Sequence, residues 1–418
     1  MPETPSSSPC DALIVGAGPA GLALATALAQ ADFRVTVLEQ QPEAALAQPA
    51  PDGREIALTH PSVQLLQALG SWQRLQAHEP GRILEAQVHD GPLRLLPGLR
   101  LPAPARLQGA PIGWIVPNHA LRRSAYAVAR AQPGVQLISQ AQVRQVGIGS
   151  QAAQVDFTLA GGALHRLQAP LVVAADSRFS ATRRQLGVAT KMQDFGRSVI
   201  VCRMRHAQPH HEVAHECFGY ARTLAILPLP SDPEDGALQC SVVVTSDSAD
   251  AAALMALPPE AFAAEVQQQF EGRLGDMALC GKRHIYPLVA TYAQHFTGHR
   301  FALLGDAAVG MHPVTAHGFN LGLSGVRALA QALVQARSQG ADWGRAQALA
   351  SYGRGHHRQA WPIYEGTNAI VRLFTDARPL PRLARRLVLG GARRLPPLQA
   401  AIVGQLTGRQ ADGLRLQP

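Results

Sequence analysis

The sequence predicts an α/β protein, because apolar strand-like segments run directly into turns and helix-like segments. Ala12–Val15 is followed by a glycine turn, an Ala- and Leu-rich helix over Pro19–Gln30 and a second strand over Arg34–Leu38. This βαβ order within about thirty residues is typical of doubly wound α/β folds. Two later segments, Leu171–Ala175 and Phe301–Leu304, repeat the pattern of a buried strand that ends in a turn.

The composition indicates a folded globular chain. Its 418 residues carry a formal net charge of +9, with 47% hydrophobic and 16% charged residues. Disordered chains combine low hydrophobicity with many charges, so that class is excluded. Five cysteines without a CxxC pair exclude a small disulfide scaffold and favour reduced thiols in a cytosolic protein. The length favours two or three domains.

The uncharged stretch Ala12–Ala31 is long enough to cross a bilayer. However, the glycines of its turn would break a spanning helix, and residues 1–10 lack the basic start of a signal peptide. We therefore interpret the stretch as strand, turn and buried helix, preceded by a polar tail over residues 1–9 that we expect to be disordered.

The turn after the first strand reads Gly-Ala-Gly-Pro-Ala-Gly at residues 16–21. In a GxGxxG turn the first glycine permits the tight turn, the second lets a pyrophosphate approach the backbone, and the third allows close helix packing. These positions are Gly16, Gly18 and Gly21. The alternative is a glycine-rich turn that serves helix packing alone.

The helix that follows opens with Pro19 and Ala20, and its free amides and dipole favour a bound phosphate. Glu39 ends the second strand, where a carboxylate can accept hydrogen bonds from ribose hydroxyls. An acid at this position disfavours a 2′-phosphate, so FAD or NAD fits better than NADP.

Two later turns carry chemical groups. Gly305-Asp306 follows a strand and places a carboxylate where it can bind polyol hydroxyls, and Ala316–Asn320 opens a helix whose amides could meet the anionic edge of a reduced flavin. From the residues alone, this segment is either a ligand-binding turn or a structural loop. Asp176 follows the strand Leu171–Ala175, where it is equally consistent with a helix cap.

The other predicted elements position these turns. Residues 41–53 form a Pro- and Ala-rich loop, and residues 81–115 and 192–290 contain short strands, including Leu224–Leu229 and Ser241–Thr245. Helices are predicted over Leu58–Leu75, Leu121–Ala131, Pro259–Phe270, from the second turn to about Ala336, and in the C-terminal region.

In their order along the chain, the turns at residues 16–21, 174–183 and 305–306 resemble the three fingerprints of FAD-dependent aromatic-ring monooxygenases. The resemblance covers nearly the whole chain. Further segments resemble the ubiquinone-biosynthesis hydroxylase branch: GREIAL at 53–58, GWIVPN at 113–118 with Leu121-Arg122, and AHECF at 214–218. Residues 175–180 and 305–314 are most similar to its 5-demethoxyubiquinol hydroxylase sub-type.

The resemblance implies a discontinuous Rossmann-like FAD-binding domain, an interleaved β-sheet substrate domain and a helical C-terminal region. The implied FAD-binding parts are residues 10–80, 116–190 and 291–376. The implied substrate-domain parts are 81–115 and 191–290, and 377–418 is a basic helical region.

The resemblance also implies which residues hold FAD. The glycine turn takes the pyrophosphate, Glu39 the ribose and Asp306 the ribityl chain, while Gly318 and its neighbours face the isoalloxazine. The full set is Gly16, Gly18, Pro19, Ala20, Gly21, Glu39, Arg54, Asn118, Arg122, Asp176, Gly305, Asp306, His317, Gly318, Phe319 and Asn320.

Three positions depart from the family pattern: Ser177 replaces the usual Gly, Val309 the usual His and His317 the usual Gln. His317 is the candidate for a catalytic group beside the flavin, and the alternative is a positioning residue. No catalytic acid or base is otherwise assigned.

The implied activity is hydroxylation of the aromatic ring of a polyprenyl phenol or quinol in ubiquinone biosynthesis. NAD(P)H is the reductant and O₂ the oxidant, through a flavin hydroperoxide. Alternatives are a hydroxylase of a small soluble aromatic acid and a non-catalytic FAD-binding assembly or sensor protein. Association with other ubiquinone-biosynthesis proteins is a further expectation.

Weaker signals concern metals and surfaces. His206, His210, His211 and His215 have ligand-like spacing, but Pro209 interrupts a helix there and no acid triad completes a site, so no metal is expected. His356-His357 is expected on a solvated helix face.

The C-terminal region 377–418 contains eight arginines and one acid, interleaved with leucines. It either lies on an anionic membrane or packs on its own domain with its arginines in solvent. A polyprenylated substrate favours peripheral docking on the inner face of the cytoplasmic membrane. No nucleic-acid recognition motif is present in the sequence.

Overall fold

The computed structural model describes residues 10–91, 98–103, 109–219, 222–311 and 317–375, and residue 404. The predicted tail 1–9 and the predicted basic region 377–418, apart from Gly404, lie outside this part of the chain.

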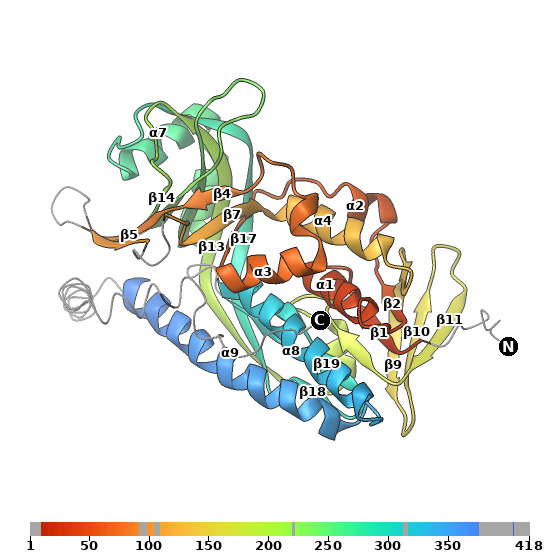
Figure 1. The fold of residues 1–418 in the computed structure, drawn as a ribbon. Coiled ribbons are helices and arrows are strands. Elements are labelled where there is room, and N and C mark those ends of the chain that lie inside the picture. The colour runs from red at the N-terminus through yellow and green to blue at the C-terminus, as the bar shows by residue number, and fades with distance from the viewer. Residues whose placement is uncertain are drawn as a thin grey trace.

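A six-stranded sheet forms the centre of the α/β part, in the order β18-β19-β12-β1-β2-β8 (Figure 1). From β19 to β8 its neighbouring strands pair in parallel, and β18 pairs antiparallel with β19. This sheet confirms the predicted α/β class. Its strands are β1 (Ala12–Val15), β2 (Val35–Leu38), β8 (Val135–Ile138), β12 (Val172–Ala174), β18 (Thr297–Gly298) and β19 (Phe301–Leu303).

Helices pack on this sheet because their apolar faces can be buried there. Helix α1 contacts α4, α3 and α8, and α8 contacts the long helix α9 that crosses one side of the molecule (Figure 1). Leu24 and Leu28 of α1 are inaccessible to solvent, as are Leu13 and Ile14 of β1. The helices are α1 (Pro19–Ala29), α2 (Glu43–Ala47), α3 (His60–Leu69), α4 (Asn118–Ala131), α5 (Ala181–Gln185), α8 (His317–Ser338) and α9 (Ala346–Thr375).

A second, eight-stranded sheet has the order β20-β17-β13-β16-β15-β14-β5-β6. Helices α6 (Ser248–Ala256) and α7 (Pro259–Gln269) cover one of its faces. Its strands are β5 (Glu85–Asp90), β6 (Leu99–Pro102), β13 (Thr190–His206), β14 (Val213–Phe218), β15 (Thr223–Pro228), β16 (Gln239–Asp247), β17 (Met277–Ala293) and β20 (Val309–Gly310).

Two smaller sheets complete the fold. The strands β3 (Glu55–Leu58), β7 (Gly113–Pro117) and β4 (Gly81–Ile83) pair antiparallel next to the large sheet. The strands β9 (Gln142–Ile148), β10 (Ala153–Thr158) and β11 (Leu164–Ala169) form an antiparallel sheet at the edge of the α/β part. The predicted domain boundaries stay a prediction.

Three details differ from the sequence expectations. The predicted helix over Leu58–Leu75 ends at Leu69, because Gly70 adopts a positive φ of 84° that terminates a helix. A 3-10 turn, η1 (Trp72–Arg74), follows it. The predicted loop 41–53 contains the short helix α2.

The expectation of a solvated His356-His357 pair is wrong for His356. That side chain is 2% exposed and stacks on Tyr352, with ring centroids 5.4 Å apart. It fits because Gly325 of α8 lacks a side chain at the closest approach of the two helices. Burial lowers the pKa of His356 to about 4. His357 is exposed.

Candidate active site

The glycine turn has the geometry that its sequence predicts. Gly16 has a φ of 109°, and a methyl group there would meet the Ala175 carbonyl oxygen at 2.5 Å. A methyl group on Gly21 would approach the Gly16 carbonyl oxygen within 3.0 Å, a separation that real Cβ atoms essentially never show. Gly18 instead faces open space, and a methyl group there would have no neighbouring atom within 4 Å.

Helix α1 therefore begins at an open position. Gly18 is its N-cap and supplies no side-chain cap, and Pro19 is its first residue. The first amides of a helix lack intrahelical partners and attract anions. An open N-terminus beside a glycine turn fits the pyrophosphate of FAD.

Glu39 lies at the end of β2 and is fixed by two backbone amides. Its Oε2 accepts a hydrogen bond from the Ala17 amide at 2.7 Å, and its Oε1 accepts one from Gln41 at 2.8 Å. A carboxylate has about four lone-pair sites, so both oxygens can still accept from ribose hydroxyls. Arg122 donates to the Gln41 side chain at 3.1 Å, which places it beside the same group.

Arg54 and Asn118 meet at a residue that the sequence analysis missed, Asp52. Arg54 donates to Asp52 Oδ2 through Nε at 2.9 Å and Nη2 at 2.5 Å, and Asn118 Nδ2 donates to the same oxygen at 2.8 Å. Although partial burial opposes it, the Arg54 guanidinium holds the pKa of Asp52 below its usual range. Asp52 therefore orients both predicted FAD-binding side chains.

Two arginines join the turn after β12, which contains Asp176, to the Gly305-Asp306 turn after β19. Arg178 Nη2 lies 3.3 Å from Asp306 Oδ2, and the buried Arg183 donates to the Ala307 carbonyl at 2.8 Å. Gly305 has a φ of 59°, and a methyl group there would meet Ala20 of α1 at 3.2 Å. The Gly-Asp turn thus lies against the start of α1. Arg183 had no assigned role in the sequence analysis.

Asp176 acts as a local cap in the structure. Its carboxylate accepts hydrogen bonds from the Ser180 hydroxyl and the Thr182 amide, and Ser180 in turn caps α5 by accepting from Arg183. A direct role of Asp176 toward FAD stays a prediction. Ser177 has a φ of 91°, so it keeps a backbone conformation typical of the glycine that the family usually has there.

The start of α8 carries His317, Gly318, Phe319 and Asn320. Asn320 Oδ1 accepts from the Thr59 amide at 3.0 Å, and its Nδ2 donates to the Ala57 carbonyl at 2.8 Å. Asn320 therefore ties the helix start to β3. The flavin contacts predicted for these four residues stay predictions.

A partly buried ion pair lies beside this group of residues. Glu55 of β3 has a 2% exposed side chain, and its Oε1 accepts from Arg203 of β13 at 2.8 Å. Burial raises the pKa of Glu55 to about 7, against the lowering effect of Arg203. Sequence reasoning missed the pair, because its partners are 148 residues apart.

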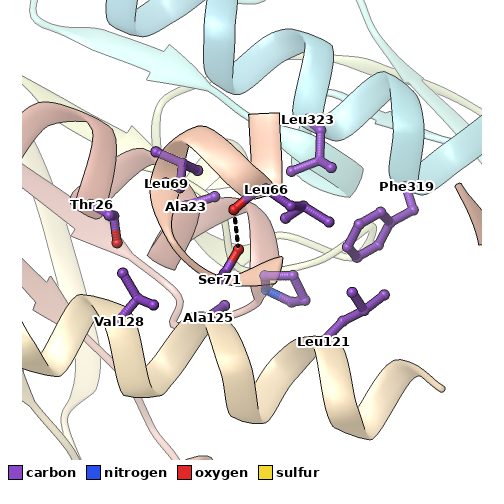
Figure 2. Close-up of a pocket in the computed structure, with 11 residues that line it drawn as sticks. Ala23, Thr26, Leu66, Leu69, Ser71, Leu121, Ala125, Val128, Phe319 and Leu323 are labelled. Atoms are coloured by element: carbon purple, nitrogen blue, oxygen red, sulfur yellow. Dashed lines mark hydrogen bonds between the residues drawn. The ribbon is translucent and has the colours of Figure 1, made fainter. Parts of the chain in front are cut away.

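A small pocket lies between α1, α3, α4 and α8, and its lining includes Pro19 and Phe319 of the predicted FAD-binding set (Figure 2). The Ser71 hydroxyl in its wall donates to the Leu66 carbonyl at 3.2 Å. Charged side chains are absent from its lining, so it does not suit a diphosphate. The lining residues are Pro19, Ala23, Thr26, Leu66, Leu69, Ser71, Leu121, Ala125, Val128, Phe319 and Leu323.

Three of the four histidines with ligand-like spacing have other partners. His206 contacts the Gln208 carbonyl at 2.8 Å, His210 the Leu229 carbonyl at 2.9 Å, and His215 packs with His89. Within the part of the chain that the structure describes, no group of three or more His, Cys, Asp or Glu side chains is arranged to hold a metal. In the same part, no helix is long and apolar enough to span a membrane.

Comparisons with known proteins show which family the chain belongs to. A family model described as FAD binding domain matches residues 9–367. The chain is 43% identical over 401 residues to ubiquinone hydroxylase UbiM of Neisseria meningitidis, covering 95% of this chain and 84% of that protein. It is 35% identical over 398 residues to ubiquinone hydroxylase UbiL of Rhodospirillum rubrum, covering 95% and 89%.

The fold is similar to that of solved flavoproteins. The crystal structure of p-nitrophenol 4-monooxygenase PnpA from Pseudomonas putida superposes with a TM-score of 0.77 at 18% identity, covering 98% of this chain and 99% of that one. At this identity the likeness concerns the fold.

Proposed function

The chain belongs to the FAD-binding-domain family of flavoprotein monooxygenases, and from this premise we propose that it hydroxylates an aromatic ring in ubiquinone biosynthesis. It is an FAD-dependent hydroxylase that uses NAD(P)H and O₂. Its substrate is a polyprenyl phenol or quinol intermediate.

The observation that carries the proposal is the near full-length similarity to a protein named a ubiquinone hydroxylase, and the geometry of the glycine turn supports it. The relative from Neisseria meningitidis, which is named a ubiquinone hydroxylase, aligns with 95% of this chain. The open N-terminus of α1 and the carboxylates of Glu39 and Asp306 support the proposal, because they offer the donors and acceptors that FAD would need.

The predicted residues offer donors or acceptors for the pyrophosphate, the adenosine ribose and the ribityl chain of FAD. The α1 amides from Pro19 onward would hold the pyrophosphate and Glu39 the adenosine ribose. Asp306 would hold the ribityl chain, and Arg54 and Asn118 would lie beside it. The chemistry that FAD supplies when bound is activation of O₂ with electrons from NAD(P)H.

The protein orients the ring and keeps water away from it. The large sheet presents an apolar surface of Val199, Val201 and Leu288 on the side of Asp52 and Arg54. Exclusion of water prevents the activated oxygen from being lost as peroxide. The Asn320 contacts to β3 hold the start of α8 in place, so its amides can face the anionic edge of a reduced flavin.

A polyprenylated substrate is found in the membrane, so we also propose that the enzyme meets it at the membrane surface. The eight arginines and one acid of residues 377–418 support this, since each basic residue near an anionic surface contributes about 1 kcal/mol. Deletion of these residues should lower the fraction of protein that sediments with anionic vesicles. An unchanged fraction would contradict surface docking by this region.

The central test uses the purified holoprotein. We expect a yellow protein with bound FAD, in which a prenylated phenol or quinol accelerates NAD(P)H oxidation and yields a product one oxygen atom heavier. Complementation of strains that each lack one ubiquinone-ring hydroxylase, with the accumulated intermediates identified by mass, would establish which ring position is attacked.

The alternatives give different results. Hydroxylation of phenolic acids but not of prenylated rings would favour a soluble aromatic acid as substrate. Bound FAD without substrate-dependent NAD(P)H oxidation would favour the assembly or sensor protein. Absence of bound flavin would contradict all three readings.

A further inference from the structure

The eight-stranded sheet has two faces with different partners. Along β13, Ile200, Cys202 and Met204 pack against α6 and α7, whereas Val199 and Val201 point to the opposite face. Alternate residues of a strand point to opposite faces, so the pairing register assigns the residues of every other strand to one face or the other.

The face of Val201 looks toward the predicted FAD site. Gly53, between Asp52 and Arg54, packs so closely there that a methyl group on it would meet Val201 Cγ2 at 3.1 Å. Ala214 of β14 packs in one cluster with Ala57 of β3, whose carbonyl accepts the Asn320 side chain. The face therefore borders both Arg54 and the start of α8.

Glu216 of β14 lies on this face. Its register partners are Ala225 of β15 and Val88 of β5, and Ala225 pairs in turn with Val243, which pairs with Val201. The next residue, Cys217, packs on the other side, in the core under α6 and α7. Glu216 thus stands in a row of apolar residues across the sheet.

The carboxyl group of Glu216 has no protein partner among the residues that the structure describes. Loss of hydration raises the pKa of Glu216 to about 8, and it is the single cause of the shift. No charged neighbour contributes to it. Arg203 lies on the same face but is already paired with Glu55. At neutral pH Glu216 is therefore mostly a neutral carboxyl group.

The Glu216 side chain is half-buried. A desolvated polar group without a partner is unfavourable, and a bound ligand would supply the missing hydrogen bonds. A neutral carboxyl has one donor and free acceptor sites, and so does an aromatic hydroxyl. The two groups can pair reciprocally without burying a charge. An apolar wall that contains one such carboxyl suits a ring that carries a hydroxyl substituent.

We propose that Glu216 binds the ring hydroxyl of the aromatic substrate and so fixes which edge of the ring faces the flavin. This inference rests on the proposed function and assigns to this chain a substrate-specifying residue on β14. Glu216 acts by binding and orientation, and the oxygen transfer itself needs no group from it.

The test is a cycle of two changes, one in the protein and one in the ligand. The ligands are a phenol that carries a single isoprene unit and its methyl ether, and the proteins are the wild-type holoenzyme, Glu216→Leu and Glu216→Gln. Dissociation constants come from the change in flavin absorbance on titration. A cycle isolates the pairwise interaction because each single change serves as reference.

We expect the wild type to prefer the phenol over the ether by about tenfold or more, as for a site built around a hydroxyl. The preference should fall to less than about twofold in Glu216→Leu and persist in Glu216→Gln, because an amide also donates and accepts. With the quinol substrate, Glu216→Leu should also release more hydrogen peroxide per NAD(P)H consumed.

The matched control is Glu212→Leu, which makes the same change at a partly exposed glutamate just before β14 that pairs with Arg82 at 3.9 Å. It should keep the wild-type preference. If Glu216→Leu does not retain FAD, Glu216→Met replaces it. A preference that survives loss of the carboxyl overturns the inference.

A different result would contradict the proposed function itself. In that case the wild type would form no hydroxylated product from any prenylated ring, whatever the binding cycle gives. A wild type that hydroxylates the ring but shows no coupling between Glu216 and the hydroxyl would leave the function intact and remove Glu216 from substrate binding.

Discussion

Two glycines of the same turn should respond differently to the same substitution, because one faces open space and the other faces backbone. Gly18 faces open space and has a φ of −69° that alanine adopts freely, so Gly18→Ala should leave the folded protein without FAD nearly intact. Alanine is a poorer N-cap than glycine, so we expect a loss of unfolding free energy of no more than about 1 kcal/mol. Its methyl group would stand where the pyrophosphate approaches.

Gly21→Ala places its methyl group against backbone instead, within 3.0 Å of the Gly16 carbonyl oxygen. Overpacking costs about 1–3 kcal/mol, and because a carbonyl held in a tight turn gives way poorly, we take the upper end. Helix propensity returns about 1 kcal/mol on replacing glycine by alanine. The expected net loss of unfolding free energy is therefore about 2 kcal/mol.

The assay separates stability from affinity. Urea unfolding of flavin-free protein measures the first, and titration with FAD measures the second. In Gly18→Ala a steric cost of about 1–3 kcal/mol against bound FAD weakens binding by about 5- to 150-fold. Gly21→Ala should lose both stability and affinity, because the clash displaces the start of α1.

Gly147→Ala in β9 is the control, since its methyl group also meets nothing within 4 Å but lies away from the turn. It should leave FAD affinity unchanged and raise the unfolding free energy by no more than about 1 kcal/mol, the difference between glycine and alanine in a strand. The reasoning would be refuted if Gly18→Ala bound FAD as tightly as the wild type, or if it unfolded as readily as Gly21→Ala.

Three further outcomes follow from single contacts. Asp306→Ala should weaken FAD binding but leave the unfolding free energy within about 1 kcal/mol, since its pair with Arg178 is partly exposed; unchanged FAD affinity would remove Asp306 from the site. Asp342→Ala should destabilise the protein by about 3 kcal/mol in urea unfolding, because it strips the buried Arg300 of its charge partner; a loss below about 1 kcal/mol would contradict this. Glu55 ionises near pH 4.5 in the unfolded chain but near 7 in the folded protein, so the wild type loses unfolding free energy as the pH rises between these values. The unfolding free energy of Glu55→Gln should therefore rise relative to that of the wild type over this range, by up to about 3 kcal/mol. Parallel stability curves for the two proteins would disprove the shift.

The parts of the site that the sequence predicted depend on local interactions. The β1–α1–β2 unit, the roles of Gly16 and Gly21 in the turn, and the position of Glu39 arise within about thirty residues, where residue type restricts the backbone directly. The strands Leu224–Leu229 and Ser241–Thr245 were also predicted, as β15 and β16, from continuous apolar runs.

The parts that sequence reasoning missed depend on residues brought together by the fold. Asp52 gains its role from Asn118, 66 residues away, and Arg183 from Ala307, 124 residues away. His356 looked solvated because its sequence neighbours are polar, but Gly325 of another helix makes room for it. β17 was not recognised as one strand because Gly281, Lys282 and Pro287 interrupt its apolar pattern.

The pairing of β13 with β17 has a consequence for how the protein unfolds. The two 17-residue strands are hydrogen-bonded along most of their length, from Thr190 with Ala293 to His206 with Met277 (Figure 1). One end of the ladder is buried in the α/β core through Ala290 and Ala293, while the other lies under α7. A fragment that ends near residue 190, or begins near 293, would lose the β-ladder that closes its own core. The chain should therefore melt as one cooperative unit and resist separation into independently folding modules.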